Sequence, residues 1–338
     1  MKRVLIGISG GVDSSVAAAL LKDEGYEVIG LTFVFTDEFD STDAIKVCEK
    51  LNIEHHIVDY KEIFKETIID KFLNDYKSGI TPNPCVTCNK EVKFNFLYQK
   101  MQEYNCDYIA TGHYAKIKDG RLYVSEDLKK DQTYFLSQLT KEQLSKLLLP
   151  LEGITKEKVR SLAHSYDLIN ADRKDSTDVC FITSNFKDYM SKNIKDNPGD
   201  VINVDTNEVI GKHNGLSNYT IGQRKGLNIG GTNGRMYVVS KDIMNNRLYI
   251  AIGDENNHLV STSCVVENFN LIGDKIINAQ ARFRYHQPLT DVTIEYLENN
   301  KIIVNYPSGV KAVTPGQACV IYLNDECIGG GIIKEVKK

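Results

Sequence analysis

The sequence lacks the features that mark membrane and exported proteins. Its 338 residues contain no apolar run that approaches the roughly 20 residues needed to span a bilayer. The amino-terminal segment MKRVLIGISGG starts with charged residues, but its apolar part is short and ends at glycines. This pattern is typical of a first β-strand rather than of a signal peptide. We therefore expect no membrane contact and a cytoplasmic location.

The sequence also lacks a strong excess of either charge. Its 41 lysines and arginines face 45 aspartates and glutamates, which gives a formal net charge of −4. A protein built only to hold nucleic acid is usually more basic. Any RNA contact must therefore depend on local basic segments, such as GQRKGLNIGGTNGR at 222–235. There Arg224 and Lys225 lie among glycines, which allow a close approach to phosphates.

Cysteine is comparatively frequent, with eight residues. A long chain in a reducing compartment does not use cysteines as a disulfide framework. Some of the eight are expected to be reactive or to bind metal, and the others to be small buried hydrophobic residues. The packing class is predicted to contain Cys48, Cys106, Cys264, Cys319 and Cys327.

Strand-like and helix-like segments alternate through the first half of the chain. Near-continuous apolar strands are predicted at 3–8, 27–35, 54–60 and 106–113, with helices at 14–25 and 41–52. This βαβ order indicates a parallel sheet that is covered on both faces, and ligands bind such sheets beyond the carboxyl ends of the strands. Helices are expected from about 133 to 190, with Thr140 and Gln143 forming a capping box and Thr155 capping a second helix.

Short β-like segments follow position 197 and are separated by Asn-Gly, Gly-Gly and Asn-Asn pairs. They include NGLSNYTIG at 214–222, and further strands are expected from about 260 to the end. Regular short strands with turn signals favour a small barrel. The chain is long enough for two or three domains.

The turn SGGVDSS at 9–15 is the first candidate site. Gly7, Gly10 and Gly11 let backbone N–H groups approach an anion, and the helix that begins here carries positive charge at its start. The segment is not a Walker A loop, because it has no lysine, and it does not follow the Rossmann spacing. Asp13 is unexpected beside phosphates unless it faces Mg²⁺. The alternative is a glycine-rich strand–helix turn with no ligand.

Two cysteine motifs form the second candidate site. TPNPCVTCNKEVKF at 81–94 contains Cys85 and Cys88, and RKDSTDVCFI at 173–182 contains Cys180. Arg173 and Lys174 precede Cys180 closely enough to favour a thiolate there. A structural zinc site is an alternative, but the sequence has no second C-x-x-C pair. An iron–sulfur cluster held by the three cysteines is the other alternative.

These motifs resemble those of known families. SGGVDSS matches the pyrophosphatase loop (PP-loop) of the ATP-pyrophosphatase family. Together with the cysteine motifs, ATGHYA at 110–115, NYTIGQRKGLNIGG at 218–231, ARFRYHQ at 281–287 and AVTPGQACVIY at 312–322, it is similar to the tRNA-specific 2-thiouridylases. The resemblance covers essentially the whole chain. It implies an α/β parallel-sheet PP-loop domain over 1–195, a central tRNA-binding domain over 196–258 and a C-terminal β-barrel over 259–338.

The resemblance also implies a reaction. ATP adenylates the carbon-2 oxygen of the wobble uridine of tRNA, and sulfur then replaces that oxygen to give 2-thiouridine, AMP and pyrophosphate. Cys180 corresponds to the cysteine that carries sulfur as a persulfide, and Cys88 to the other catalytic cysteine. The implied cofactors are ATP and Mg²⁺, with a [4Fe-4S] cluster on Cys85, Cys88 and Cys180 as the alternative. The implied partners are tRNA and a sulfur donor, either a cysteine desulfurase or a sulfur relay protein.

Further roles carry over residue by residue as implications of the resemblance. The ATP-binding residues would be Gly7, Ile8, Ser9, Gly10, Gly11, Val12, Asp13, Ser14, Phe33 and Gly112. The target base would meet Asn83, Pro84 and Cys85. The tRNA-binding residues would be His113, Lys130, Asp131, Gln132, Arg284, Tyr285 and Gln317.

The chain departs from the pattern of these enzymes at several points. Phe33 replaces a common methionine, the segment 33–47 is shorter than expected, and Asp178 stands where glycine is common. Two other functions remain as hypotheses. One is a PP-loop enzyme that acts on a small molecule, and the other is a non-catalytic RNA-binding module.

Overall fold

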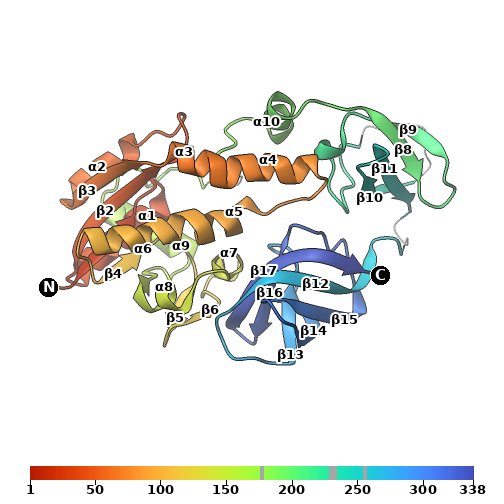
Figure 1. Ribbon diagram of the computed structural model, residues 1–338. Helices are drawn as coiled ribbons and strands as arrows, with labels where there is room; N and C mark the ends of the chain where they lie inside the picture. The colour runs from red at the N-terminus through yellow and green to blue at the C-terminus, as the bar shows by residue number, and fades with distance from the viewer. Residues whose placement is uncertain (176–178, 228–233, 254–256) are drawn as a thin grey trace.

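The computed structural model describes residues 1–175, 179–227, 234–253 and 257–338. The chain forms three lobes (Figure 1): a helix-covered sheet that holds the N-terminus, a small β lobe and a barrel. Asp178 lies outside the described residues, as does the segment 228–233 within the glycine-rich stretch. No helix among the described residues combines the length and the apolar character required to cross a bilayer.

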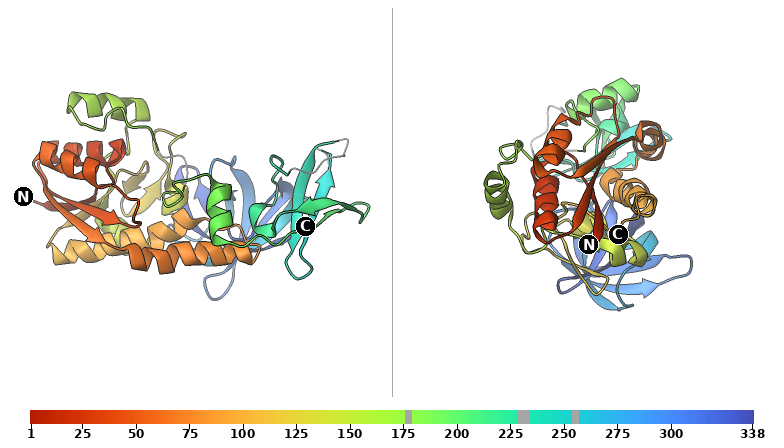
Figure 2. Two further views of the ribbon diagram at one scale, coloured as in Figure 1. Left: turned by 90° about the horizontal axis from the view of Figure 1, so that it is seen from above. Right: turned by 90° about the vertical axis from the view of Figure 1, so that its left-hand side faces the viewer.

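The predicted parallel sheet is confirmed, and its strands are ordered β3-β2-β1-β4-β7. Every pairing within it is parallel. Val4 and Ile6 pack into one core with helices α1 and α9, whereas Leu5 packs into another with α6, so helices cover both faces (Figure 2). The strands are β1 (Arg3–Gly7), β2 (Glu27–Val34), β3 (Glu54–Asp59), β4 (Tyr108–Ala110) and β7 (Leu147–Leu148).

The covering helices begin and end where the sequence signals predict. Gly25, at φ +85°, follows the end of α1. Thr140 and Gln143 form the expected capping box, and the Thr155 side chain accepts a hydrogen bond from the Lys158 N–H. The helices are α1 (Val12–Asp23), α2 (Thr42–Leu51), α7 (Thr133–Leu136), α8 (Lys141–Lys146), α9 (Lys156–Ser165) and α10 (Phe186–Asn193).

Two long helical rods contain π-helical turns. The first joins α3 (Lys61–Phe64), η1 (Lys65–Ile69) and α4 (Asp70–Lys77), and the second joins α5 (Pro84–Thr87), η2 (Cys88–Lys93) and α6 (Phe94–Glu103). Such turns occur frequently at functional sites. The second rod begins with Pro84 at its first position and is capped by Asn83, whose Oδ1 accepts from the Val86 N–H at 3.3 Å. Cys88 therefore stands at the start of a π turn.

The small central lobe contains four strands in the order β10-β11-β8-β9. One expectation is wrong here: the stretch 214–222 forms the 3₁₀ turn η3 (Leu216–Asn218) rather than a strand. The cause is local. Gly215 adopts φ +138°, and the Asn218 N–H donates a hydrogen bond to the Gly215 carbonyl, which closes the turn. The strands are β8 (Gly199–Asn203), β9 (Val209–His213), β10 (Met236–Asp242) and β11 (Arg247–Ile252).

The carboxyl-terminal strands close into the predicted barrel, because β12 pairs with both β15 and β17. A hairpin from the first lobe extends the same sheet, with Leu122 facing Cys327. The strands are β5 (Lys116–Lys118), β6 (Arg121–Tyr123), β12 (Val260–Leu271), β13 (Asn278–Arg282), β14 (Thr290–Tyr296), β15 (Ile302–Lys311), β16 (Ala318–Leu323) and β17 (Glu326–Lys337). The five cysteines predicted to serve packing are all buried.

Candidate functional site

The glycine-rich turn leaves the sheet at the carboxyl end of β1 and leads into α1, as predicted. Gly10 adopts φ +75°, a conformation that favours glycine. The Ser14 and Ser15 hydroxyls donate to the Gly11 carbonyl at 3.0 and 2.9 Å, which fixes the start of the helix. The turn thus presents the amino end of α1 beyond the sheet edge, where an anion binds favourably.

Gly112, which follows β4, packs directly on this turn. A Cβ atom at Gly112 would lie 2.6 Å from the backbone carbon of Asp13 and 2.7 Å from the Ser14 nitrogen. No side chain fits at such distances, so glycine is required for β4 and the loop to approach each other. The structure therefore places Gly112 against the loop, and its assignment to a nucleotide site stays a prediction.

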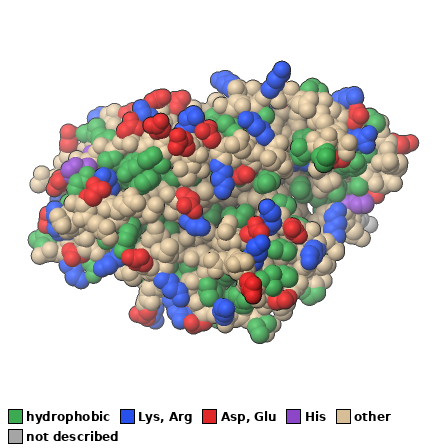
Figure 3. Space-filling view, in the orientation of Figure 1, with side chains coloured by type: hydrophobic (Ala, Val, Ile, Leu, Met, Phe, Trp, Pro, Cys, Tyr) green, Lys and Arg blue, Asp and Glu red, His purple; other side chains and the backbone are tan. Residues whose placement is uncertain are grey.

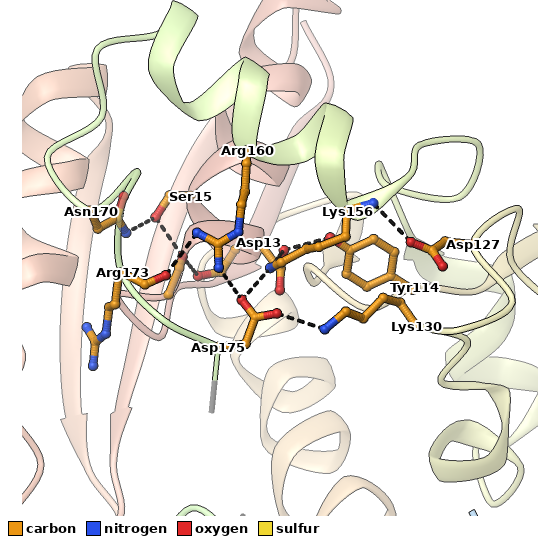
Figure 4. A network of polar contacts seen from close by, with 12 residues as sticks. Asp13, Ser15, Tyr114, Asp127, Lys130, Lys156, Arg160, Asn170, Arg173 and Asp175 are labelled. Carbon is orange, nitrogen blue, oxygen red and sulfur yellow. Dashed lines mark hydrogen bonds and ion pairs between the residues drawn. The ribbon is translucent and has the colours of Figure 1, made fainter. Parts of the chain in front are cut away.

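A polar network that the sequence analysis missed holds the loop (Figure 4). Asp13 Oδ1 accepts hydrogen bonds from the Tyr114 hydroxyl at 2.7 Å and from Lys156 Nζ at 2.6 Å. Lys156 Nζ also lies 2.9 Å from Asp175 Oδ1. The available signal was the pair Lys156 and Arg160, four residues apart at the start of a capped helix, where both cations share one face.

The other side of the loop is held by Asn170 and Arg173. Asn170 Nδ2 donates to the Gly10 carbonyl at 2.8 Å and to Ser15 Oγ at 2.9 Å. Arg173 Nη1 donates to the same carbonyl at 3.1 Å and pairs with Asp43 Oδ2 at 2.6 Å. The expectation that Arg173 supports a thiolate at Cys180 is therefore wrong, because its guanidinium is engaged by the loop and by Asp43.

The two cysteine motifs meet beside the helical rods. Cys88 is 7% exposed and packs in an apolar cluster that includes Phe181, the neighbour of Cys180. Cys85 is partly buried and Cys180 is exposed, and all three thiols are free. Charge on Cys180 would act on both Cys85 and Cys88, so the three thiols lie within electrostatic reach of one another.

Burial keeps these thiols protonated. It raises the pKa of Cys85 to about 11 and that of Cys88 to about 12, and it also raises the pKa of Cys180, whose sulfur is desolvated by neighbouring atoms. The positive charge of Lys93 opposes this effect on all three thiols. Lys93, and neither Arg173 nor Lys174, is therefore the cation whose charge favours a thiolate at Cys180.

The residues that would hold a metal do not fit one in this arrangement. No three His, Cys, Asp or Glu side chains of the described chain are grouped so that they could hold a metal ion. This applies to Cys85, Cys88 and Cys180 as iron–sulfur ligands, and to the C-x-x-C pair as half of a zinc site. Asp13, which is unexpected beside phosphates unless it faces Mg²⁺, places Oδ1 on Lys156 and Tyr114.

The segment expected to meet the target base is braced by the barrel. Gln317 Nε2 donates to the carbonyls of Thr81 and Pro82 at 2.8 and 3.2 Å. A Cβ at Gly316, which adopts φ +91°, would lie 2.3 Å from Ile80 Cγ2. Gln317 thus faces the chain just before Asn83, Pro84 and Cys85, and positions that segment rather than extending into solvent.

The residues expected near adenine and tRNA around β2 and β4 are largely enclosed. Phe33 is 8% exposed, and its ring packs against Phe35 and Tyr60. His113 Nδ1 lies 2.8 Å from Thr111 Oγ1, and burial lowers the pKa of His113 well below its usual value, so the ring is neutral at pH 7.

The expected tRNA contacts at 130–132 also bind protein groups. Lys130 Nζ pairs with Asp175 Oδ2 at 2.7 Å, and Gln132 Oε1 accepts from the Tyr114 N–H at 3.0 Å. Asp131 is 3% exposed and accepts hydrogen bonds from the Thr133 hydroxyl and from the Ser125 N–H. This buried carboxylate organises the segment, which leaves no exposed oxygen for a direct contact with RNA.

The barrel residues expected to meet tRNA lie where the three lobes join. Arg284 Nη2 donates to the Ile221 carbonyl at 2.9 Å and to Thr314 Oγ1, and the Tyr285 ring packs on Phe135 with centroids 4.4 Å apart. Arg224 and Lys225 are exposed.

The loop, its serine hydroxyls and the cations behind it define a nucleotide-binding protein of the ATP-pyrophosphatase type. The chain is 42% identical over 372 residues to the tRNA-specific 2-thiouridylase MnmA of Mesoplasma florum, with 99% of this chain and 100% of that protein covered. It is 44% identical over 361 residues to tRNA-specific 2-thiouridylase MnmA 1 of Geobacillus kaustophilus, with 100% and 96% covered. The chain therefore belongs to the tRNA-specific 2-thiouridylase family.

Three family models match successive parts of the chain. They are described as a tRNA methyl transferase HUP domain over 2–184, a tRNA methyl transferase PRC-barrel domain over 187–252, and an aminomethyltransferase β-barrel domain over 261–333. Among solved structures, a 4-thiouridine synthetase–RNA complex with bound ATP has 17% sequence identity and a TM-score of 0.37, covering 57% of this chain and 50% of that one. That likeness is too low to bear on function.

The contact between Gly112 and the loop predicts the effect of a single added methyl group. Gly112→Ala places a Cβ within 2.6 Å of the loop backbone, so the loop must move and ATP affinity must fall by about tenfold or more. Isothermal titration with ATP measures this. Gly153→Ala is the matched control, because a Cβ there meets no atom within 4 Å. Equal ATP affinity in the two variants would contradict the prediction.

The position of Lys93 predicts a pH effect. Its charge lowers the pKa of each nearby thiol, so Lys93→Gln raises that pKa and shifts the pH profile of Cys180 alkylation by iodoacetamide to higher pH. Peptide mass spectrometry gives the rate at each pH. Lys93→Arg restores the profile. Lys90→Gln, which removes a lysine paired with Glu91, leaves the profile in place. A profile unchanged by Lys93→Gln would rule out this role.

Proposed function

We propose that this chain converts the wobble uridine of tRNA into 2-thiouridine, consuming ATP and releasing AMP and pyrophosphate. Full-length similarity to tRNA-specific 2-thiouridylases supports the activity. One observation supports the sulfur chemistry in particular: the thiols of both cysteine motifs lie within reach of the positive charge of Lys93. Lys93 acts on the three thiols and also on His113, which directly follows the glycine that touches the nucleotide loop.

In the proposed first step, the uridine carbon-2 oxygen attacks the α-phosphorus of ATP and pyrophosphate leaves. Backbone N–H groups of the loop and the start of α1 hold the leaving anion. The ATP-binding assignments of Gly7 to Ser14, Phe33 and Gly112 are part of this proposal. Mg²⁺ would neutralise the phosphates as it does for nucleotides in general, with no residue of this chain assigned to it.

In the second step, the terminal sulfur of a Cys180 persulfide attacks the activated carbon 2. Cys88 then attacks Cys180 Sγ, a disulfide forms, and the electron pair of the broken S–S bond stays with the transferred sulfur. AMP leaves with the original oxygen, and a thiol reductant must reopen the disulfide before the next turnover. Thiolates are the reactive species in both sulfur steps, so the charge of Lys93 favours each of them.

The substrate and partner assignments follow from this reaction. Asn83, Pro84 and Cys85 are proposed to meet the base, and His113, Gln132, Arg284, Tyr285 and Gln317 to border or position the tRNA. On the face shown in Figure 3, lysine and arginine side chains lie on both sides of the boundary between the barrel and the rest of the molecule, with acidic side chains among them. A cysteine desulfurase or a sulfur relay protein is proposed to load Cys180, in the cytoplasm.

The domain division is proposed at 1–195, 196–258 and 259–338. The first and third family models fall within the proposed limits, whereas the second begins at 187, inside the range given to the first domain. Two rival functions lack comparable support. If the chain were a PP-loop enzyme for small molecules, the cysteine pair and the barrel would have no function. If it were only an RNA-binding module, the loop would have no function. The [4Fe-4S] route is not favoured, because the three cysteines are not arranged as ligands.

Cysteine substitutions test the proposal. We expect the chain, incubated with ATP, Mg²⁺, tRNA and a sulfur source, to exchange one oxygen for sulfur in the wobble uridine, as nucleoside mass spectrometry reports. Cys88→Ser and Cys180→Ser each abolish the exchange. Cys106→Ser, at a buried thiol outside the site, retains it. Unmodified tRNA with the wild-type protein would refute the function, and a Cys88→Ser or Cys180→Ser protein that still thiolates tRNA would refute the persulfide route.

A further inference from the structure

Three cationic side chains converge on one carboxylate beside the nucleotide loop (Figure 4). Lys130 Nζ lies 2.7 Å from Asp175 Oδ2, while Lys156 Nζ and Arg160 Nη2 lie 2.9 and 2.7 Å from Asp175 Oδ1. Lys156 and Arg160 come from the first two turns of α9, and Lys130 from the segment that precedes α7. Distant parts of the chain thus concentrate positive charge at one point.

This point adjoins the loop itself. Lys156 Nζ lies 2.6 Å from Asp13 Oδ1, its side chain is only 8% exposed, and its backbone N–H donates to Asp127 Oδ2 at 3.0 Å, which fixes where the chain enters α9. Residues 7–14 contain no lysine or arginine. A leaving pyrophosphate needs cations as well as backbone N–H groups. The convergent cations can supply that charge without any lysine in the loop.

The Asp175 carboxylate binds these cations in the manner of a phosphate, through two oxygens shared among three donors. Partial burial alone would raise the pKa of Asp175, but hydrogen bonds from Lys130 and Lys156 outweigh it and lower that pKa to about 2. The carboxylate is therefore charged at pH 7. Counting Asp13 as well, three cations face two carboxylates, and removal of Asp175 would leave two positive charges uncompensated.

We propose that Lys130, Lys156 and Arg160 bind the β- and γ-phosphates of ATP, and that Asp175 competes with those phosphates for the three cations. The proposal rests on the ATP use of the proposed function, and it moves Lys130 from the tRNA surface to the nucleotide site. Competition by Asp175 weakens the hold on pyrophosphate, so the product leaves more readily after adenylation. Asp175 is thus a positioning residue that sets the affinity of the site.

Binding of inorganic pyrophosphate to the full chain, without tRNA, tests the competition. Asp175→Asn removes the competing charge but keeps a similar shape, and is expected to tighten pyrophosphate binding about tenfold in isothermal titration. Asp172→Asn removes the same charge from a carboxylate on the same segment that is 94% exposed, and is expected to change nothing. Unchanged or weaker binding by a folded Asp175→Asn protein would overturn the proposal, because a purely structural Asp175 predicts that outcome.

If Asp175→Asn does not fold, a second variant, Lys130→Gln, tests whether the three cations bind the phosphates. Lys130 is 40% exposed, so Lys130→Gln disturbs little of the core. It is expected to weaken ATP and pyrophosphate binding about fivefold or more, while AMP and tRNA affinities stay the same. Loss of tRNA affinity with unchanged pyrophosphate affinity would overturn the proposal and return Lys130 to the tRNA surface. These are binding measurements, so a failure of tRNA thiolation would leave their outcome unaffected.

Discussion

A lysine ammonium that is buried away from water must lie beside groups of opposite charge. In the first lobe this requirement applies to Lys156. Its ammonium, on a side chain 8% exposed, can be placed only where Asp13 of the loop and Asp175 reach it together. That condition joins the glycine-rich turn, the start of α9 and the chain that leads toward Cys180. The loop therefore does not depend on its glycines alone. Asn170 and Arg173 hold its opposite side through the Gly10 carbonyl, so both flanks of the turn are fixed before a ligand binds.

The sulfur chemistry is subject to the opposite condition. Burial raises the pKa of the thiols, to about 12 for Cys88, although sulfur must be ionised to react. Lys93 is the described cation whose charge acts on all three thiols, and it stands on the same π-helical turn that begins with Cys88. An α-helical continuation would place these residues differently, since a π turn rotates each side chain less than an α turn does. The π-helical turn therefore helps to place Lys93 where its charge can favour ionisation of the thiols.

The sequence allowed the sheet, the loop, the barrel and both cysteine motifs to be predicted, because each depends on local patterns. Apolar strands, glycines at the start of a helix and the capping pair Thr140 and Gln143 can each be recognised from a few neighbouring residues. The failures involve contacts that are distant in sequence. Arg173 was assigned to Cys180 by proximity, yet it binds Gly10, which lies more than 160 residues away. The burial of the Asp131 carboxylate, in a segment that the resemblance assigns to tRNA, was likewise not foreseen from the sequence. The segment 214–222 carries strand-forming residues, but the positive φ of Gly215 turns the chain.

The hairpin of β5 and β6 has a consequence for biosynthesis. Its second strand, β6, pairs with β17, and Arg121 bonds to Glu326 across 205 positions of the chain. While the ribosome is still making the second half, β6 presents an open edge whose backbone groups have no partner strand, a template for misassociation with other chains. The charged and polar residues around its tip, KIKDGRLY at 116–123, oppose such encounters. This pairing must therefore await translation of β17, and a nascent chain stalled before that strand would expose the edge to chaperones.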